Sequence, residues 1–104
     1  MPTTQIAAEP SADAKTLTIK IDGRFDFGAH QQFRDAYERV FPKPDKFVVD
    51  LQATNYLDSS ALGMLLLLRD HAGGDHANVE ITNSTTDVRK ILGISNFEKL
   101  FDIK

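Results

Sequence analysis

Apolar and polar positions follow two different periods along the chain, and these periods predict strands and helices in a fixed order. Residues 17–21 alternate apolar with polar side chains, which is typical of a half-buried strand, and Asp22-Gly23 is expected to end it. Residues 47–51 are apolar without alternation, as expected for a central strand covered by helices. Further strands are predicted at residues 5–9, 79–82 and 100–103.

Three helices are predicted between these strands. The first spans residues 29–41, where Pro42 is expected to stop it. Its apolar stripe consists of Phe33, Ala36, Tyr37, Val40 and Phe41. The second spans residues 59–72 and ends at Gly73-Gly74, and the third spans residues 85–92 and ends at Gly93.

The order of these elements predicts an α/β fold. Strands that alternate with helices form a mainly parallel or mixed sheet with the helices packed against it. With 104 residues, the chain has length for one hydrophobic core. We therefore expect a single domain over residues 1–104, in which residues 1–14 are weakly ordered or form a short edge strand.

Composition and charge exclude several functions. A formal net charge of −3 and the lack of a basic run argue against direct binding of nucleic acid, because phosphates require a basic surface. Without cysteine there is no disulfide, thiol nucleophile or thiolate metal site. The chain starts without a secretory signal pattern, and its longest apolar run, residues 64–68, is too short to insert across a membrane. A cytoplasmic location is expected.

The start of the second predicted helix is the most informative segment. Asp58, Ser59 and Ser60 all favour helix N-caps, and they follow the strand at residues 47–51 by a short loop. Backbone N–H groups and the positive end of the helix dipole at this position would receive a phosphoryl group on Ser59. Capping alone also explains a serine there, so this segment fits both a phosphoacceptor and a plain cap.

Three ordered motifs resemble a known family. The helix start reads Asp58-Ser59-Ser60-Ala61-Leu62-Gly63, and a strand before the first helix reads Ile19-Lys20-Ile21-Asp22-Gly23-Arg24-Phe25-Asp26. A later strand, Val79-Glu80-Ile81-Thr82-Asn83, is followed by a helix and turn over residues 88–97. Together these motifs resemble the STAS domain of anti-sigma factor antagonists. Ala61 stands where the family most often has glycine, and its methyl group affects the partner's approach more than the fold.

The resemblance implies a regulatory function without catalysis. The family's phosphorylated residue directly follows aspartate, which here is Ser59, with Ser60 as the alternative acceptor. The expected partners are an anti-sigma factor, often itself a serine kinase of the histidine-kinase-like ATPase fold, and a serine phosphatase. Unphosphorylated protein would bind the anti-sigma factor and free a sigma factor, and phosphorylation would end binding. The alternative function is a non-switching STAS subunit of a membrane lipid-transport or sensory scaffold complex.

The second helix also predicts a partner-binding face. At about 100° per residue, Gly63, Met64 and Leu67 share an arc with Ser59 and Ser60. The opposite arc, expected to pack on the sheet, contains Ala61, Leu62, Leu65, Leu66 and Leu68. Asp26 and Asp58 are expected in loops beside this face. Coverage by neighbouring elements, or plain exposure of scattered apolar residues, explains Met64 and Leu67 equally well.

Other chemistries lack their sequence signatures. The chain has no Gly-x-Ser-x-Gly elbow, and His30, His71 and His76 have no recognisable triad context. His71 and His76 are five residues apart with two glycines between them, which does not place them on one helical face as metal ligands. Gly73-Gly74-Asp75 lacks the lysine and hydroxyl of a phosphate-binding loop. We expect no catalytic residues, no metal and no cofactor.

Overall fold

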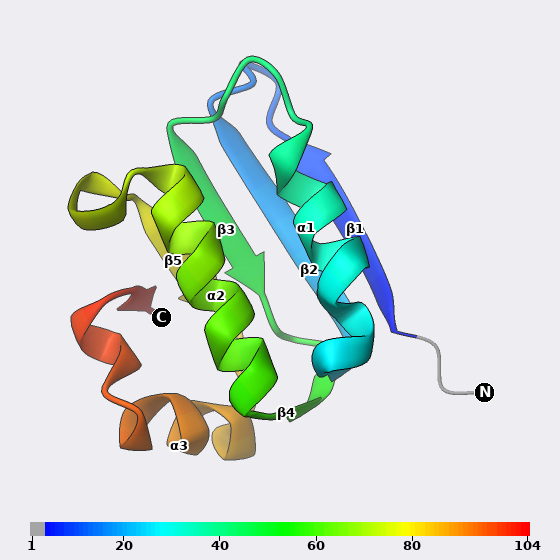
Figure 1. The fold of residues 1–104 in the computed structure, drawn as a ribbon, viewed down its shortest axis with the longest axis vertical. Helices are drawn as coiled ribbons and strands as arrows, with labels where there is room; N and C mark the ends of the chain where they lie inside the picture. The colour runs from blue at the N-terminus through cyan, green and yellow to red at the C-terminus, as the bar shows by residue number, and fades with distance from the viewer. Residues whose placement is uncertain (1–3) are drawn as a thin grey trace.

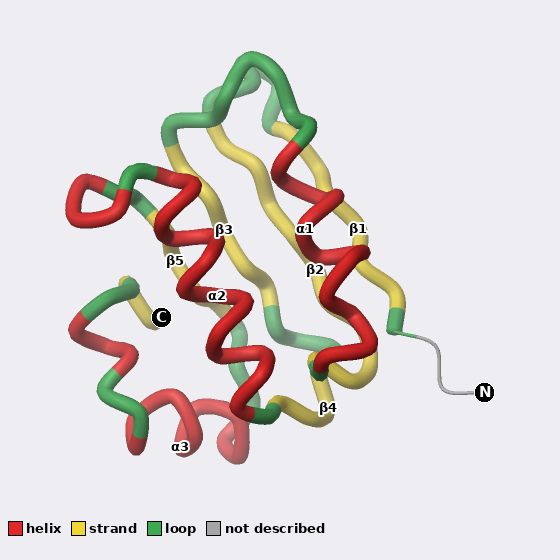
Figure 2. Tube along the Cα trace, viewed as in Figure 1, coloured by secondary structure: helices red, strands yellow, loops and turns green. Residues whose placement is uncertain are grey.

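The computed structural model of the protein describes residues 4–104. It is a small α/β domain in which helices pack against a mixed, mainly parallel sheet, as predicted (Figure 1). The strands are β1 (Gln5–Pro10), β2 (Thr16–Phe25), β3 (Lys46–Asp50), β4 (Thr54–Leu57), β5 (Val79–Thr82) and β6 (Asp102–Ile103). The helices are α1 (His30–Glu38), α2 (Ser59–Ala72) and α3 (Thr86–Ile94). Short 3-10 turns occupy Phe27–Ala29, Gly74–His76 and Phe97–Lys99 (Figure 2).

The sheet has the strand order β1-β2-β3-β5-β6. Strand β1 is antiparallel to β2, and the pairs β2·β3, β3·β5 and β5·β6 are parallel. The end of β2 leaves β3 and pairs instead with β4, through a register shift between Gly23 and Arg24. Gly23 has a φ of 103°, which glycine adopts without strain, so it supports this irregularity rather than ending the strand as predicted.

The core lies between one face of the sheet and the two helices α1 and α2, which both lie in front of the sheet in Figure 1. Strand β3 alternates between buried and half-exposed residues, because helices cover only that one face. The prediction that residues 47–51 are a strand is confirmed, but its full coverage by helices is wrong. The fully buried residues of the sheet include Leu17, Ile19, Ile21, Phe47, Val49 and Ile81.

The open face of the sheet carries a buried acid. Glu80 on β5 is only 8% exposed and forms ion pairs with Lys46 and with Lys104, the latter at 3.4 Å between Nζ and Oε1. The hydrogen bond from Lys46 is the main cause that lowers the pKa of Glu80, and Lys104 adds to it against the opposing effect of burial. Charge pairing therefore replaces apolar packing on this face.

Several elements differ from the sequence prediction. The strand predicted at residues 100–103 is shorter, because β6 spans only Asp102–Ile103. Helix α1 ends at Glu38, because Val40 closes a tight turn onto the carbonyl of Tyr37, and Phe41 is left 92% exposed instead of joining the apolar stripe. Helix α3 continues through Gly93, and the left-handed residue that follows it is Asn96, with a φ of 59°. Strand β4 was missed, because only its first and last residues are buried and its pattern does not alternate.

Other predictions agree with the structure. Helix α2 and strand β5 have the predicted bounds. The predicted strand at residues 5–9 is β1, which extends to Pro10, while residues 1–3 of the predicted N-terminal segment lie outside the described residues. None of the helices over residues 4–104 has the length and apolar content needed to cross a bilayer.

Candidate functional site

Two aspartates lie side by side at the carboxyl ends of two paired strands, β2 and β4. Strands β2 and β4 are parallel and pair Phe25 with Leu57, so the next residues, Asp26 and Asp58, leave the sheet side by side. Each aspartate begins a helical segment and accepts a hydrogen bond from its backbone. The pairing of β2 with β4 therefore brings the predicted Asp26 loop beside the start of α2.

Asp58 holds the first turn of α2. Its Oδ1 accepts hydrogen bonds from the backbone N–H of Ala61 at 3.1 Å and from the Ser60 hydroxyl at 2.6 Å. The bond from Ser60 is the main cause that lowers the pKa of Asp58, and the Arg24 charge adds a smaller contribution. Asp58 thus remains ionised at neutral pH and orients Ser60.

Ser59 and Ser60 differ in availability. Ser60 is half-buried and its hydroxyl is engaged by Asp58. Ser59 is exposed at the first position of α2, and over residues 4–104 its hydroxyl has no hydrogen-bond partner. Because α2 is 14 residues long, its N-terminus presents a substantial positive dipole end at Ser59. Of the two predicted acceptors, Ser59 has the accessible hydroxyl.

Arg24 is a residue of this site that the sequence analysis did not identify. Its Nε donates to Oδ2 of Asp26 at 3.1 Å, and its guanidinium lies 4.0 Å from the centre of the Tyr56 ring. Tyr56 is paired with Arg24 across β2 and β4. Since β4 was not predicted, the only sequence signal for this contact was the position of Arg24 two residues before Asp26.

The predicted partner-binding face of α2 needs correction at Met64. Met64 is 3% exposed, because α1 packs beside α2 and covers the arc that contains it. Leu66, predicted to be core, is 39% exposed on the side away from the buried positions. Gly63 and Leu67 are exposed, as predicted, with Leu67 at 52%. The core positions of α2 are Ala61, Met64, Leu65 and Leu68.

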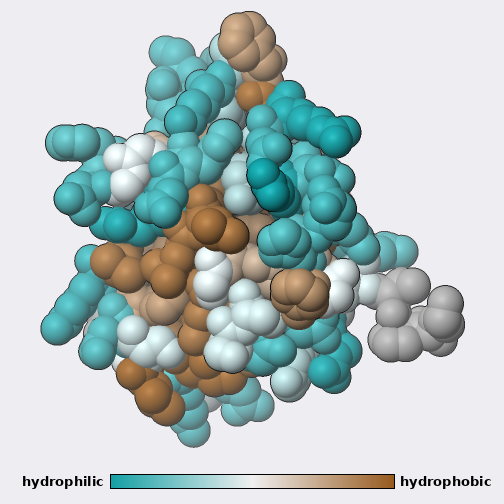
Figure 3. Space-filling model, viewed as in Figure 1, coloured by the Kyte–Doolittle hydropathy of each residue, from teal (hydrophilic) through white to brown (hydrophobic). Residues whose placement is uncertain are grey.

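Leu67 lies at the rim of a cleft between α1 and α2. The cleft has a volume of about 230 Å³ and is lined by His30, Phe33, Arg34, Tyr37, Glu38, Met64, Leu67 and His71. Figure 3 shows apolar surface along α2 within a largely polar view of the molecule. The exposed apolar side chains of α2, Leu66 and Leu67, are suited to protein contact.

His71 is half-buried in this cleft rather than fully on the surface. Its ring lies 5.0 Å from that of Tyr37 and 6.0 Å from that of Phe47, measured between centroids. Burial is the main cause that lowers its pKa, and the Lys43 charge adds to the effect. These contacts make His71 an aromatic packing residue of the cleft.

The sequence and the fold agree with those of known proteins. The profile of the family described as "Mlab, STAS domain" matches residues 8–102. A STAS-domain containing protein from Pseudomonas aeruginosa (strain UCBPP-PA14) is 67% identical over 98 residues, covering 94% of this chain and 97% of that protein.

Several solved structures share the fold at low sequence identity. An anti-sigma factor antagonist from Mycobacterium paratuberculosis has a TM-score of 0.76 at 16% identity, covering 97% of this chain and 85% of that one. The anti-sigma factor antagonist SpoIIAA in its unphosphorylated form has a TM-score of 0.74 at 17% identity, covering 96% and 87%. A sulfate transporter family protein from Wolinella succinogenes has a TM-score of 0.74 at 12% identity, covering 88% and 74%. With the profile match over nearly its whole length, this chain belongs to the STAS domain family.

Proposed function

We propose that this protein is an anti-sigma factor antagonist whose partner binding is switched off by phosphorylation of Ser59. The fold is shared with anti-sigma factor antagonists, including SpoIIAA, for which phosphorylated and unphosphorylated forms are both known. The observation that carries the proposal is the exposed hydroxyl of Ser59, next to a Ser60 hydroxyl that Asp58 engages at 2.6 Å.

The unphosphorylated protein binds through the surface around Asp26 and Asp58, at the carboxyl ends of β2 and β4. Its contact residues are Asp26, Asp58, Ser60, Gly63 and Leu67, and Met64 supports them from within the core. The partner is an anti-sigma factor, which is also the serine kinase where that factor has the histidine-kinase-like ATPase fold. The domain acts by binding in the cytoplasm and needs no catalysis of its own.

Phosphorylation changes the charge of this surface more than the fold. A phosphate adds about −1.5 to −2 charges near neutral pH. Against an opposing carboxylate at about 4 Å, with an effective dielectric near 20, each added charge disfavours contact by about 4 kcal/mol. The N-terminus of α2 accommodates the same negative charge favourably, so the free domain stays folded. A serine phosphatase then restores binding.

The phosphoacceptor is tested by incubating the protein with candidate serine kinases and ATP, then locating phosphate by fragmentation mass spectrometry. Ser59→Ala is expected to abolish incorporation. Ser60→Ala is the matched control, because it removes a neighbouring hydroxyl that is already hydrogen-bonded. Unchanged incorporation in Ser59→Ala would assign the acceptor elsewhere.

A second function is supported by the exposed leucines of α2. Leu66 and Leu67 offer an apolar contact that requires no phosphorylation, as in a non-switching STAS subunit of a membrane lipid-transport or sensory complex. The shared fold with a sulfate transporter family protein is compatible with such a subunit. Intact mass after co-expression with candidate kinases separates the two functions, because only the switch protein gains phosphate.

A further inference from the structure

The two outer edges of the sheet are built differently. Strand β6 has two residues, Asp102 and Ile103, and ends beside Lys104, so shortness and charge both protect that edge from further pairing. Strand β1 has six residues, and in the described part of the chain it pairs only with β2. The β1 edge is therefore the longer unpaired edge of the sheet.

Strand β1 has few features that prevent pairing. Its register with β2 is continuous from Gln5 opposite Asp22 to Pro10 opposite Leu17, without a bulge. Glu9 is its single charged residue, and its proline is the last residue. In an antiparallel pair, alternate residues direct N–H and C=O groups away from the partner strand, so β1 presents such groups on its outer side.

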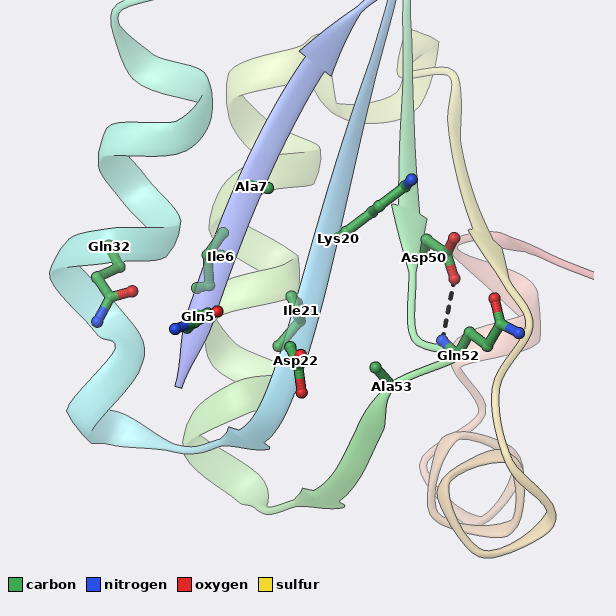
Figure 4. Close-up of a pocket in the computed structure, with 10 residues that line it drawn as sticks. All are labelled: Gln5, Ile6, Ala7, Lys20, Ile21, Asp22, Gln32, Asp50, Gln52 and Ala53. Atoms are coloured by element: carbon green, nitrogen blue, oxygen red, sulfur yellow. Dashed lines mark hydrogen bonds between the residues drawn. The ribbon is translucent and has the colours of Figure 1, made fainter. Parts of the chain in front are cut away.

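A hollow beside β1 is left unfilled by the chain's own side chains. Its volume is about 590 Å³, and Gln5, Ile6 and Ala7 line it from β1. The other lining residues are Lys20, Ile21, Asp22, Gln32, Asp50, Gln52 and Ala53 (Figure 4). Lys20 and Asp22 on β2 and Asp50 on β3 place most of this hollow inward of β1, so a strand paired with the outer edge of β1 does not have to fill it.

We propose that two copies of this chain pair through β1, antiparallel, about a two-fold axis at Ala7. In this register Gln5 lies opposite Glu9 of the second copy, and Ile6 lies opposite its Ala8. The sheet then continues across both copies, which is the self-complementary contact that two-fold symmetry requires.

The burial pattern of β1 selects this register. Ile6 and Ala8 are half-buried on the helix-covered face, whereas Gln5, Ala7 and Glu9 are exposed on the open face. Pairing about Ala7 keeps both sets on their own faces, because directly opposite residues of a sheet share a face. A shift by one residue would place Ile6 opposite Glu9.

The charges of β1 are compatible with the same register. The two Glu9 carboxylates lie opposite Gln5 amides rather than opposite each other, and each Glu9 already pairs with Lys20 of its own chain at 3.5 Å. At the axis, the small Ala7 side chains meet without crowding. Pro10, which lacks an N–H, lies at the end of the pairing.

The pairing is independent of the proposed switch. Figure 1 shows α1 between the outer edge of β1 and α2, so both Ser59 sites stay accessible in the dimer. A single edge contact is smaller than the roughly 1,600 Å² of a standard stable interface, so we expect a weak dimer in rapid exchange.

Sedimentation equilibrium over a concentration series tests the pairing with the full chain. The unaltered protein is expected to show a monomer–dimer equilibrium. Ala7→Lys places like charges opposite each other at the axis and is expected to raise the dimer dissociation constant at least tenfold, as is Ala7→Glu. Mixing the two variants is expected to restore a dimer, because lysine then meets glutamate.

The control is Thr82→Lys, which adds the same charge to the open face at β5, three strands from β1. It is expected to leave the dissociation constant unchanged, and circular dichroism melts check that each variant folds. A protein that stays monomeric at millimolar concentration would overturn the proposal. So would a dimer that persists in both Ala7 variants, or a mixture that fails to restore it.

Discussion

Asp26 and Asp58 hold equivalent positions, each one residue beyond the paired strand residues Phe25 and Leu57. Their backbones match closely, with φ and ψ of −133° and −172° at Asp26 and of −124° and −173° at Asp58. They differ in their second contact, which is the Arg24 guanidinium for Asp26 and the Ser60 hydroxyl for Asp58. The carboxyl ends of β2 and β4 thus present two helix starts side by side. Of these, only the start of α2 has hydroxyl side chains next to its aspartate, on Ser59 and Ser60.

Asp58→Ala is expected to lower the free energy of unfolding by about 1 kcal/mol, because α2 loses its N-cap. The matched change Asp26→Ala removes a cap from a three-residue 3-10 turn and is expected to have a smaller effect. Urea unfolding of both variants measures the difference. Equal losses of unfolding free energy in the two variants would show that the cap of α2 stabilises the fold no more than the cap of the 3-10 turn.

Ser59→Asp is expected to weaken binding to the anti-sigma partner by up to about a thousandfold, since one added charge disfavours the contact by about 4 kcal/mol. Its thermal midpoint is expected to change little, because a carboxylate is favourable at a helix N-terminus. Calorimetric titration and thermal melts measure the two effects, with Ser59→Asn as the uncharged control. Equal weakening by both variants would contradict an electrostatic switch.

Local signals explain why α2 was predicted with the correct bounds. Asp58 and Gly73 cap its two ends through contacts within a few residues, and such contacts are readable from sequence. The position of Met64 depends instead on α1, which packs beside α2 and covers that arc. A helical period alone does not show which neighbouring element covers an arc.

The contact between Arg24 and Tyr56 was unpredictable for a related reason. It arises because β2 changes partner from β3 to β4 beyond Gly23. The predicted strand ended at Gly23 and β4 was not predicted, so no contact between the two side chains was expected. The family resemblance predicted that Asp26 and Asp58 belong to the site. That they lie side by side follows from the pairing of β2 with β4, which are far apart in the sequence.

Leu67→Glu is expected to weaken partner binding by about 2 kcal/mol or more, because it places an unpaired carboxylate in a desolvated contact. The free domain should change little, since Leu67 is 52% exposed. Leu65→Glu is the contrasting variant, because Leu65 is fully buried and its replacement by a charge should unfold the domain. If Leu67→Glu melts as early as Leu65→Glu, the binding surface lies instead in the loops at Asp26 and Asp58.

Stability is expected to fall in acid through Glu80. Its pKa in the folded protein is below the ordinary value of 4.5, mainly because of the hydrogen bond from Lys46. As pH falls, the unfolded chain therefore binds a proton at this residue before the folded protein does. The stabilisation is complete above pH 4.5 and is lost as pH falls through the lower pKa that Glu80 has in the folded protein. Glu80→Gln should flatten this part of the profile measured by urea unfolding. A variant with the same acid slope as the original protein would assign that slope to other carboxylates.

Gly63→Ala is expected to change stability and binding in opposite directions. Gly63 is exposed within α2, and a Cβ built there meets no atom within 4 Å, so nothing in the described chain requires glycine. Alanine should therefore raise the free energy of unfolding by up to about 1 kcal/mol. Because Gly63 lies one turn after Ser59 on the exposed side of α2, the added methyl should hinder close approach of the partner and weaken binding.

Gly93→Ala provides the matched control for that prediction. Gly93 is also exposed within a helix, α3, and a Cβ built there likewise meets no atom within 4 Å. Both variants should therefore gain stability in thermal melts, while only Gly63→Ala should lose affinity in calorimetric titration with the anti-sigma partner. If both variants bind as tightly as the original protein, the partner does not approach the backbone of α2 closely, and contact is confined to side chains such as Leu67.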